Sequence, residues 1–493
     1  MSSVLGVARS AIRDVVFLFP ALLARLGVVD RRKGEEAFDL AVPVMVTGGM
    51  RVLLRAADFL FVGIALGDEA IAGLELGFQY YFVGFGLSLA LTSGTISVVS
   101  RLKGADEHRR ADVAVKQSLW LSLAISIPLT AASWLYAEPF IAVLTDDPST
   151  IDYGSTYLRI VMVSLAFRFW SMVAARALAG SGDTRTPMYV RTLTLPTNVV
   201  LNAVLVFGLG PFPRLGVAGA AAGTTIANTV AALIFLGIFV AGVRSVRLPL
   251  GGPQFDRGLV AEIVRVALPL SGMRLAQTLV RFPFLFILGV LGTSELAAYA
   301  IGRRVVLLAL MPAWGYATAA STLVGQAIGG GDEREAAEYG WQTARIALAT
   351  QLLIAVGIAV AARPIALAFG TDSVDLTVTF VRVFALTVAS FSLSRTMRGA
   401  LRGAGDTRWP FYGTVVGAYL VRLPIATLAL PAGFAVVVGS VSVAPGLGLG
   451  TTAVYAALVA DFTVKAAVNT ARFASGRWKG VARAAGVGTT GGD

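Results

Sequence analysis

The sequence predicts an all-α membrane protein with twelve transmembrane helices in two six-helix lobes, which are related by a parallel internal repeat. Composition is the first observation: 56% of the 493 residues are hydrophobic, 14% are charged and the mean hydropathy is +0.75, too apolar for a soluble protein of this size. Repetition is the second: residues 180–187 (GSGDTRTP) recur as 403–410 (GAGDTRWP), and residues 55–107 align without a gap with 281–333. Duplicated apolar halves are typical of secondary transporters.

Twelve apolar segments are each long enough to cross a bilayer, which takes roughly 20 residues. The alternating short segments of a transmembrane barrel are missing from the sequence. The predicted spans are residues 39–66, 70–100, 111–136, 151–178, 188–208, 217–243, 263–292, 295–328, 340–362, 375–402, 411–432 and 450–474.

The orientation follows from the distribution of Lys and Arg between the spans. Basic residues gather in one alternate set of connections, such as 31–33 and 101–110, whereas the other set carries acids such as Asp146 and Asp147. The positive-inside rule then places both termini in the cytoplasm, as an even number of spans requires. The predicted organisation is a cytoplasmic N-terminal segment (1–36), an N-terminal six-helix lobe (37–243), a cytoplasmic linker (244–262), a C-terminal six-helix lobe (263–475) and a cytoplasmic tail (476–493).

Residues 12–27 are apolar at their centre but too short to span the membrane. Pro20 interrupts the run and arginines flank it. This pattern favours an interfacial helix at the cytoplasmic face over a remnant of a signal segment.

Several classes of function are poorly supported by the composition. The chain has no cysteine and a single histidine, His108, so thiol chemistry is excluded and a zinc site or histidine catalysis is not indicated. The net charge of +12 lies where a membrane protein places its positive charge, so we expect no nucleic-acid partner. The sequence contains no Walker loop and no nucleophile or diphosphate-binding motif, so we expect neither an enzyme nor a bound cofactor.

A carboxylate inside the first span distinguishes the two halves. The repeat alignment pairs Asp58 with Phe284, so only the first half retains the acid. A charged side chain in hydrocarbon costs about 3 kcal/mol and usually has a function. Asp58 is therefore our candidate proton carrier or Na⁺ ligand, and the alternative is a structural ion pair with Arg55, one helical turn away.

Two amides in the fifth span extend this polarity. Asn198 and Asn202 are four residues apart and share one helix face, whereas the second half has Val421 and Ile425 at these positions. Amide oxygens ligate hard cations or accept hydrogen bonds from a carboxylic acid. We therefore expect Asp58, Asn198 and Asn202 to form a candidate Na⁺ site, with a hydroxyl from Thr224. Packing between helices is the alternative for the amides.

Taken together, residues 37–475 resemble the multidrug and toxic compound extrusion (MATE) family. The resemblance is carried, in order, by residues 57–63, 180–187, 198–208, 216–224, 323–326 and 403–410. It implies a secondary active antiporter that exports organic cations or amphiphiles in exchange for H⁺ or Na⁺ by alternating access.

The chain is most similar to the archaeal/DinF-like branch of that family. In this branch, coupling-ion roles would fall on Asp58, Asn198, Asn202 and Thr224. The chain departs from the pattern at two places: the last polar position of the fifth span is commonly Asp but is Asn202 here, and the acid that the NorM-like branch has in the seventh span is replaced by Gln277.

A substrate cavity would be lined by polar, cationic and aromatic side chains, since aromatic faces bind lipophilic cations. Packing is the alternative role for the aromatic ones. The candidates are Arg55, Gln79, Tyr80, Gln277, Arg281, Phe284 and Trp314.

The predicted partners are the lipid bilayer and small amphiphilic or cationic molecules. We expect a monomer in the plasma membrane of a prokaryote. The alternative function is a flippase for a lipid or a lipid-linked saccharide, within the same superfamily; Arg55, Arg281 and Arg422 favour it because their charge would suit anionic head groups.

Overall fold

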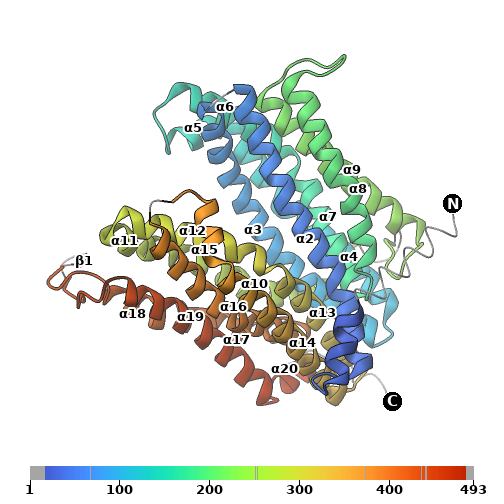
Figure 1. Ribbon diagram of the computed structural model, residues 1–493. Coiled ribbons are helices and arrows are strands. Elements are labelled where there is room, and N and C mark those ends of the chain that lie inside the picture. The colour runs from blue at the N-terminus through green and yellow to red at the C-terminus, as the bar shows by residue number, and fades with distance from the viewer. Residues whose placement is uncertain are drawn as a thin grey trace. The chain divides into compact units, whose positions relative to one another are not determined.

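The computed structural model describes residues 17–66, 68–249, 251, 254–371, 373–434, 436–438 and 441–484. The side chains of residues 51–60, 63, 68, 83, 85, 436–438 and 441–443 are outside this description. Nearly all of the described chain is helical (Figure 1).

The chain divides into two compact units. The N-unit is Pro43–Ser271, and the C-unit combines Met1–Val42 with Gly272–Asp493. The division falls inside two long helices, α2 (Arg31–Leu66) and α10 (Arg257–Leu279), and next to a proline in each, Pro43 and Pro269. These prolines are equivalent in the repeat, because both lie 12 residues before the aligned arginines.

The helices of the N-unit enclose an apolar core around Leu158, Val161 and Leu165. Small residues bring them together: a Cβ at Gly73 of α3 would lie 2.8 Å from the backbone nitrogen of Gly154 in α6. Between α2 and α10 the helices are α3 (Asp68–Gly104), α4 (His108–Leu135), α5 (Ala137–Ala142), α6 (Pro148–Val163), α7 (Leu165–Gly180), α8 (Arg185–Phe207) and α9 (Val217–Ala241).

The C-unit packs its helices around a core that includes Phe284, Phe380 and Leu458. Its elements are α11 (Arg281–Leu291), α12 (Thr293–Ala309), α13 (Met311–Gly329), α14 (Glu333–Val360), α15 (Ala362–Ala368), α16 (Val374–Gly403), α17 (Arg408–Val415), the π-helix η1 (Val416–Arg422), α18 (Leu423–Thr427), β1 (Val436–Val438), β2 (Val441–Val443), α19 (Gly450–Ala474) and α20 (Trp478–Ala484). The two strands form an antiparallel hairpin, in which Val436 pairs with Val443. This hairpin was not predicted.

The predicted helical membrane fold is confirmed. Eight described helices are long and apolar enough to cross a membrane, and ten when two bent pairs are counted, α6–α7 at 46° and α12–α13 at 44°. The two remaining predicted spans coincide with α2 and with the α17–η1–α18 run. Each of the twelve predicted ranges is therefore occupied by a helix or a broken helix.

The repeated loops form the turns that their glycines predict. Gly182 and Gly405 adopt φ of +93° and +82°, which glycine tolerates at no steric cost. Asp183 Oδ1 accepts a hydrogen bond from Thr186 N at 2.9 Å, as expected of a helix cap.

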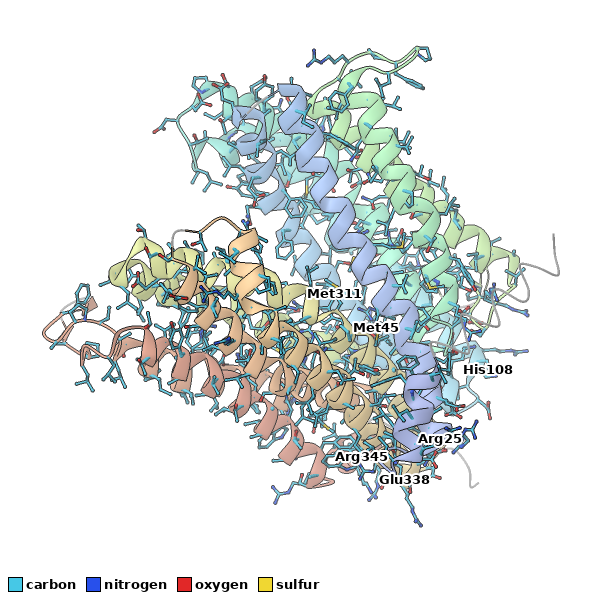
Figure 2. The ribbon with its side chains drawn as sticks, viewed as in Figure 1. Arg25, Met45, His108, Met311, Glu338 and Arg345 are labelled. Atoms are coloured by element: carbon cyan, nitrogen blue, oxygen red, sulfur yellow. The ribbon has the colours of Figure 1, made fainter. Side chains whose placement is uncertain are left out.

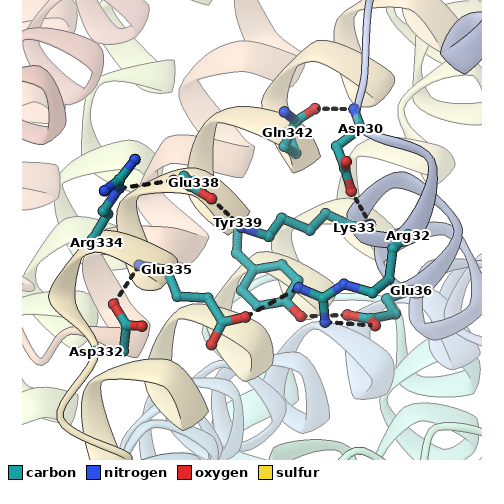
Figure 3. A network of polar contacts seen from close by, with 10 residues as sticks. All are labelled: Asp30, Arg32, Lys33, Glu36, Asp332, Arg334, Glu335, Glu338, Tyr339 and Gln342. Atoms are coloured by element: carbon teal, nitrogen blue, oxygen red, sulfur yellow. Dashed lines mark hydrogen bonds and ion pairs between the residues drawn. The ribbon is translucent and has the colours of Figure 1, made fainter.

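Charged side chains gather at one end of the C-unit, where Figure 2 labels Arg25, Glu338 and Arg345. The first turns of α2 are bound to α14 there (Figure 3). Lys33 pairs with Glu338, and Arg32 Nη2 lies 3.3 Å from Glu335 Oε1. These contacts explain why the chain before Pro43 belongs to the C-unit.

Candidate functional site

The predicted polar cluster lies where α8 and α9 approach closely. The contact depends on glycines of α9: a Cβ at Gly219 would lie 2.5 Å from the carbonyl oxygen of Leu205, and one at Gly223 would lie 2.0 Å from Asn202 Oδ1. Without a side chain at these positions, the backbone of α9 can pack directly against α8.

The structure brings Asn198, Asn202 and Thr224 together. Asn198 Nδ2 donates to Thr224 Oγ1 at 3.2 Å and, at 3.5 Å, to Asn202 Oδ1. Asn202 is fully buried, and Asn198 and Thr224 are half-buried. Because the amide nitrogen of Asn198 faces these two oxygens, its own carbonyl oxygen remains as an acceptor for a proton donor or a cation.

Contacts on both sides of residue 58 place α2 beside α8. Thr192 Oγ1 of α8 lies 3.8 Å from Met50 Sδ, and the rings of Phe61 and Phe207 meet edge to face with centroids 5.9 Å apart. Both helices therefore run in the same direction, and α2 passes the level of Asn202 between these contacts. The side chains of Arg55 and Asp58 lie outside the described residues.

Two cavity candidates of the N-unit lie on α3. The Tyr80 ring stacks on Phe140 with centroids 5.2 Å apart, and its hydroxyl donates to the Phe140 carbonyl at 2.6 Å. Gln79 is exposed and donates to Glu75 Oε1 at 2.9 Å. Tyr80 thus makes packing contacts within the unit.

The other candidates belong to the C-unit. Phe284 is fully buried, and the Arg422 guanidinium lies 3.7 Å from its ring centroid. Trp314 is 37% exposed and lies under Arg395, with the guanidinium carbon 5.1 Å from the ring centroid. Arg281 is exposed and Gln277 is half-buried.

Buried ion pairs occur in both units, and one of them joins Asp406 Oδ2 to Arg472 Nε at 2.7 Å. Within α19, Asp461 Oδ1 and Lys465 Nζ lie 2.6 Å apart, as the spacing of four residues predicts. A further pair was not predicted: Arg101 Nη2 lies 2.7 Å from Glu262 Oε1, and the side chain of Arg101 is only 1% exposed. No short-range spacing indicates this pair, because its partners are 161 residues apart in the chain.

The profile of the MatE family matches residues 43–204 and 269–428, one segment in each half. These segments include the α8 amides and both repeated loops. The chain belongs to the MatE family. The matched ranges begin at or beside Pro43 and Pro269, so each copy of the family repeat starts where the structure divides.

Named relatives match most of the chain. A probable multidrug resistance protein NorM of Bradyrhizobium diazoefficiens is 28% identical over 440 residues, which are 86% of this chain and 91% of the relative. A FAD transporter of Shewanella oneidensis is 25% identical over 71% of this chain and 77% of the relative. A crystal structure of MATE in the bent conformation has a TM-score of 0.80 at 21% identity, covering 92% of this chain and 97% of that chain. This likeness confirms the MATE fold.

Proposed function

We propose that this protein is a secondary active efflux antiporter, which exports amphiphilic or cationic molecules in exchange for H⁺ or Na⁺ by alternating access. Membership of the MatE family and relatives named as multidrug resistance proteins support transport. The observation that carries the coupling is the hydrogen-bonded cluster of Asn198, Asn202 and Thr224, beside a helix that contains an acid.

The helix that carries Asp58, α2, supports its assignment to this cluster. Residues 58, 61 and 65 share one face of α2, because positions three and four apart are neighbours on a helix. The end of α2 lies beside the end of α8 and the connection that follows it: the Phe61 ring contacts Phe207, the last residue of α8, and the Ala65 carbonyl accepts from Arg214 Nη2 at 2.6 Å. Asp58 is therefore the acid that we assign to the cluster.

The chemistry of such a site suits one monovalent cation. An ionised carboxylate in low dielectric is costly, and either a proton or Na⁺ removes that cost. Amide and hydroxyl oxygens then complete the coordination of Na⁺ or accept the acid proton. Occupation by either ion would stabilise α2 against α8, and release would free α2 to move.

The location follows from the fold and the charge distribution. The protein is a multi-pass membrane protein, and its substrates are small molecules. We further propose that it acts as a monomer in the plasma membrane, with both termini in the cytoplasm, because the basic connections then lie on the cytoplasmic side. Transport requires no catalytic group or cofactor, and we assign none.

Movement of a lipid or lipid-linked saccharide is the second candidate function. One observation favours it: Arg281 and Arg422 are cationic positions of the C-unit, and Arg422 is buried. Such side chains suit an anionic head group better than an organic cation.

The test is transport of the fluorescent cation ethidium in inverted membrane vesicles. A pH gradient and a Na⁺ gradient are applied separately to the wild type and to Asp58→Asn. We expect one gradient to drive uptake by the wild type and Asp58→Asn to lose that uptake. Unchanged uptake by the variant would show that Asp58 is not the coupling acid.

A matched pair of amide variants tests the cluster. Asn202→Ala should reduce gradient-driven uptake strongly, because it removes an oxygen next to Asn198. Asn228→Ala is the control: Asn228 lies in α9, but its amide binds Ser164 Oγ at 3.2 Å, away from the cluster. Equal losses in both variants would indicate a packing role for the amides.

A further inference from the structure

The C-unit contains a second buried polar cluster, and its charge is opposite to that of the proposed coupling site. Asp461 of α19 lies 2.6 Å from Lys465 Nζ and 3.8 Å from Arg422 Nη1. The side chains of Asp461, Lys465 and Arg422 are 1%, 12% and 10% exposed. Arg398 and Arg422 both act on Lys465 by electrostatic repulsion, and Arg274 acts on Arg398 in the same way.

Asp461 thus pairs with two cations, Lys465 and Arg422, and Arg398 and Arg274 add further positive charge nearby. Among the described residues, no other acid lies within 4 Å of the charged groups of Arg274, Arg398, Arg422 or Lys465. The Nη1 atom of Arg398 instead contacts the sulfur of Met273 at 3.3 Å, and sulfur is a weak acceptor.

Irregular helix geometry positions Arg422 within this cluster. Arg422 ends the π-helix η1, and such single-turn irregularities are frequent at functional sites. Gly417 in the same turn allows the approach to α19, since a Cβ there would lie 2.9 Å from Asp461 Oδ1. Arg422 is held over Phe284, and its buried Nε has no hydrogen-bond partner in the described chain.

The energetics favour an anion at this place. Burying an uncompensated cation in a membrane protein costs several kcal/mol. Asp461 offsets one of the four charges. An anionic group would satisfy the open donor of Arg422 and reduce the repulsion among the other cations.

We propose that this cluster binds the anionic head group, a phosphate or carboxylate, of an amphiphilic substrate. The inference rests on the proposed transport function and specifies a substrate class for it. Guanidinium groups bind such oxyanions through paired hydrogen bonds. The buried ring of Phe284, which packs on Tyr299 with centroids 5.5 Å apart, holds the Arg422 guanidinium in this position.

Binding of two matched amphiphiles tests the proposal. Radiolabelled dodecyl phosphate and dodecyltrimethylammonium are titrated onto the full-length protein in phosphatidylcholine nanodiscs. We expect Arg422→Gln to weaken dodecyl phosphate binding about tenfold or more, as the loss of a charge-assisted hydrogen bond predicts, and Arg422→Lys to recover part of it. Binding of dodecyltrimethylammonium should change little.

One control variant and a second test variant separate this effect from general charge and from misfolding. Arg477→Gln removes an exposed positive charge from the segment after α19 and should bind like the wild type. Arg398→Gln changes a cation that has no acidic partner in the described chain, so it should fold even if Arg422→Gln does not, and it should also weaken dodecyl phosphate binding. Wild-type affinity in both Arg398→Gln and any folded Arg422 variant would overturn the proposal.

Further arms identify the source of the head group and separate this proposal from the coupling mechanism. If inorganic phosphate alone displaces dodecyl phosphate, the natural ligand is a free anion. If phosphatidylglycerol in the nanodisc displaces it, the ligand is a lipid. If neither displaces it and binding still depends on Arg422, the ligand is a soluble amphiphile. If Asp58→Asn abolishes ethidium transport but the affinity for dodecyl phosphate does not depend on Arg422, this inference alone fails. If Arg422-dependent binding is found without transport under either gradient, the proposed function fails and the site stands.

Discussion

Replacement of Gly223 by alanine provides a direct test of the proposed coupling site. The added Cβ would lie 2.0 Å from Asn202 Oδ1 and 3.0 Å from the Asn202 backbone nitrogen. The first distance is 1.4 Å inside the 3.4 Å at which ordinary contact begins. Either α9 must move away from α8 or the Asn202 amide must rotate, which would break its contact with Asn198. Overpacking of this kind lowers the free energy of unfolding by about 1–3 kcal/mol. The higher helix propensity of alanine offsets only about 0.5–1 kcal/mol of that loss.

Gly237→Ala is the matched control, because Gly237 lies in the same helix and no atom lies within 4 Å of its added Cβ. Thermal unfolding in detergent should therefore show a lower midpoint for Gly223→Ala than for the wild type, and an equal or higher midpoint for Gly237→Ala. Gradient-driven ethidium uptake should fall only in Gly223→Ala. If both variants unfold and transport alike, the close approach of α8 and α9 at Asn202 is refuted, and with it the geometry of the cluster.

Two further predictions concern stability, measured by thermal unfolding in detergent. Glu262→Gln should destabilise the protein by about 3–5 kcal/mol, because it leaves the buried Arg101 without its counter-charge; an unchanged midpoint would contradict the pairing. Asp147 caps α6, and hydrogen bonds from Thr150 hold the pKa of its carboxyl below the ordinary value. Its contribution is therefore complete above the unfolded pKa of about 3.9 and is lost as the pH falls through the folded pKa. Asp147→Ala should be less stable than the wild type at pH 6, and the difference should shrink below pH 4; a constant difference would exclude the charge as its cause.

Part of the site could be predicted from local spacing alone. Asn198 and Asn202 are one helical turn apart, so periodicity places both amides on one face of α8. Comparison with Val421 and Ile425, at the equivalent positions of the second half, then indicates that only the first half has this polar pair. Thr224 is 22 residues further on, in another helix, and its contact with Asn198 at 3.2 Å depends on the glycines that let α9 approach. Short-range patterns do not specify such a contact.

The cluster of Asp461, Lys465 and Arg422 was harder to predict from the sequence. The spacing of Asp461 and Lys465 indicates their pairing, because residues four apart meet on a helix. The addition of Arg422 depends on the irregular turn of η1 and on the close contact at Gly417. A regular helix would place Arg422 on a different face, so neither its position over Phe284 nor its pairing with Asp461 follows from helical periodicity.

The sequence by itself determined the membrane class, the twelve helical segments and the duplication. The physical reason is that backbone polar groups in a bilayer must be satisfied within each segment, so length and hydropathy suffice to predict a spanning helix. Only the tertiary structure decided which side chains of different helices meet: Asn198 with Thr224, Arg101 with Glu262, and Arg422 with Asp461 and Phe284. Those contacts depend on the rotation and close approach of whole helices, which are set by packing at a few glycines and irregular turns rather than by the hydrophobic pattern of any one segment.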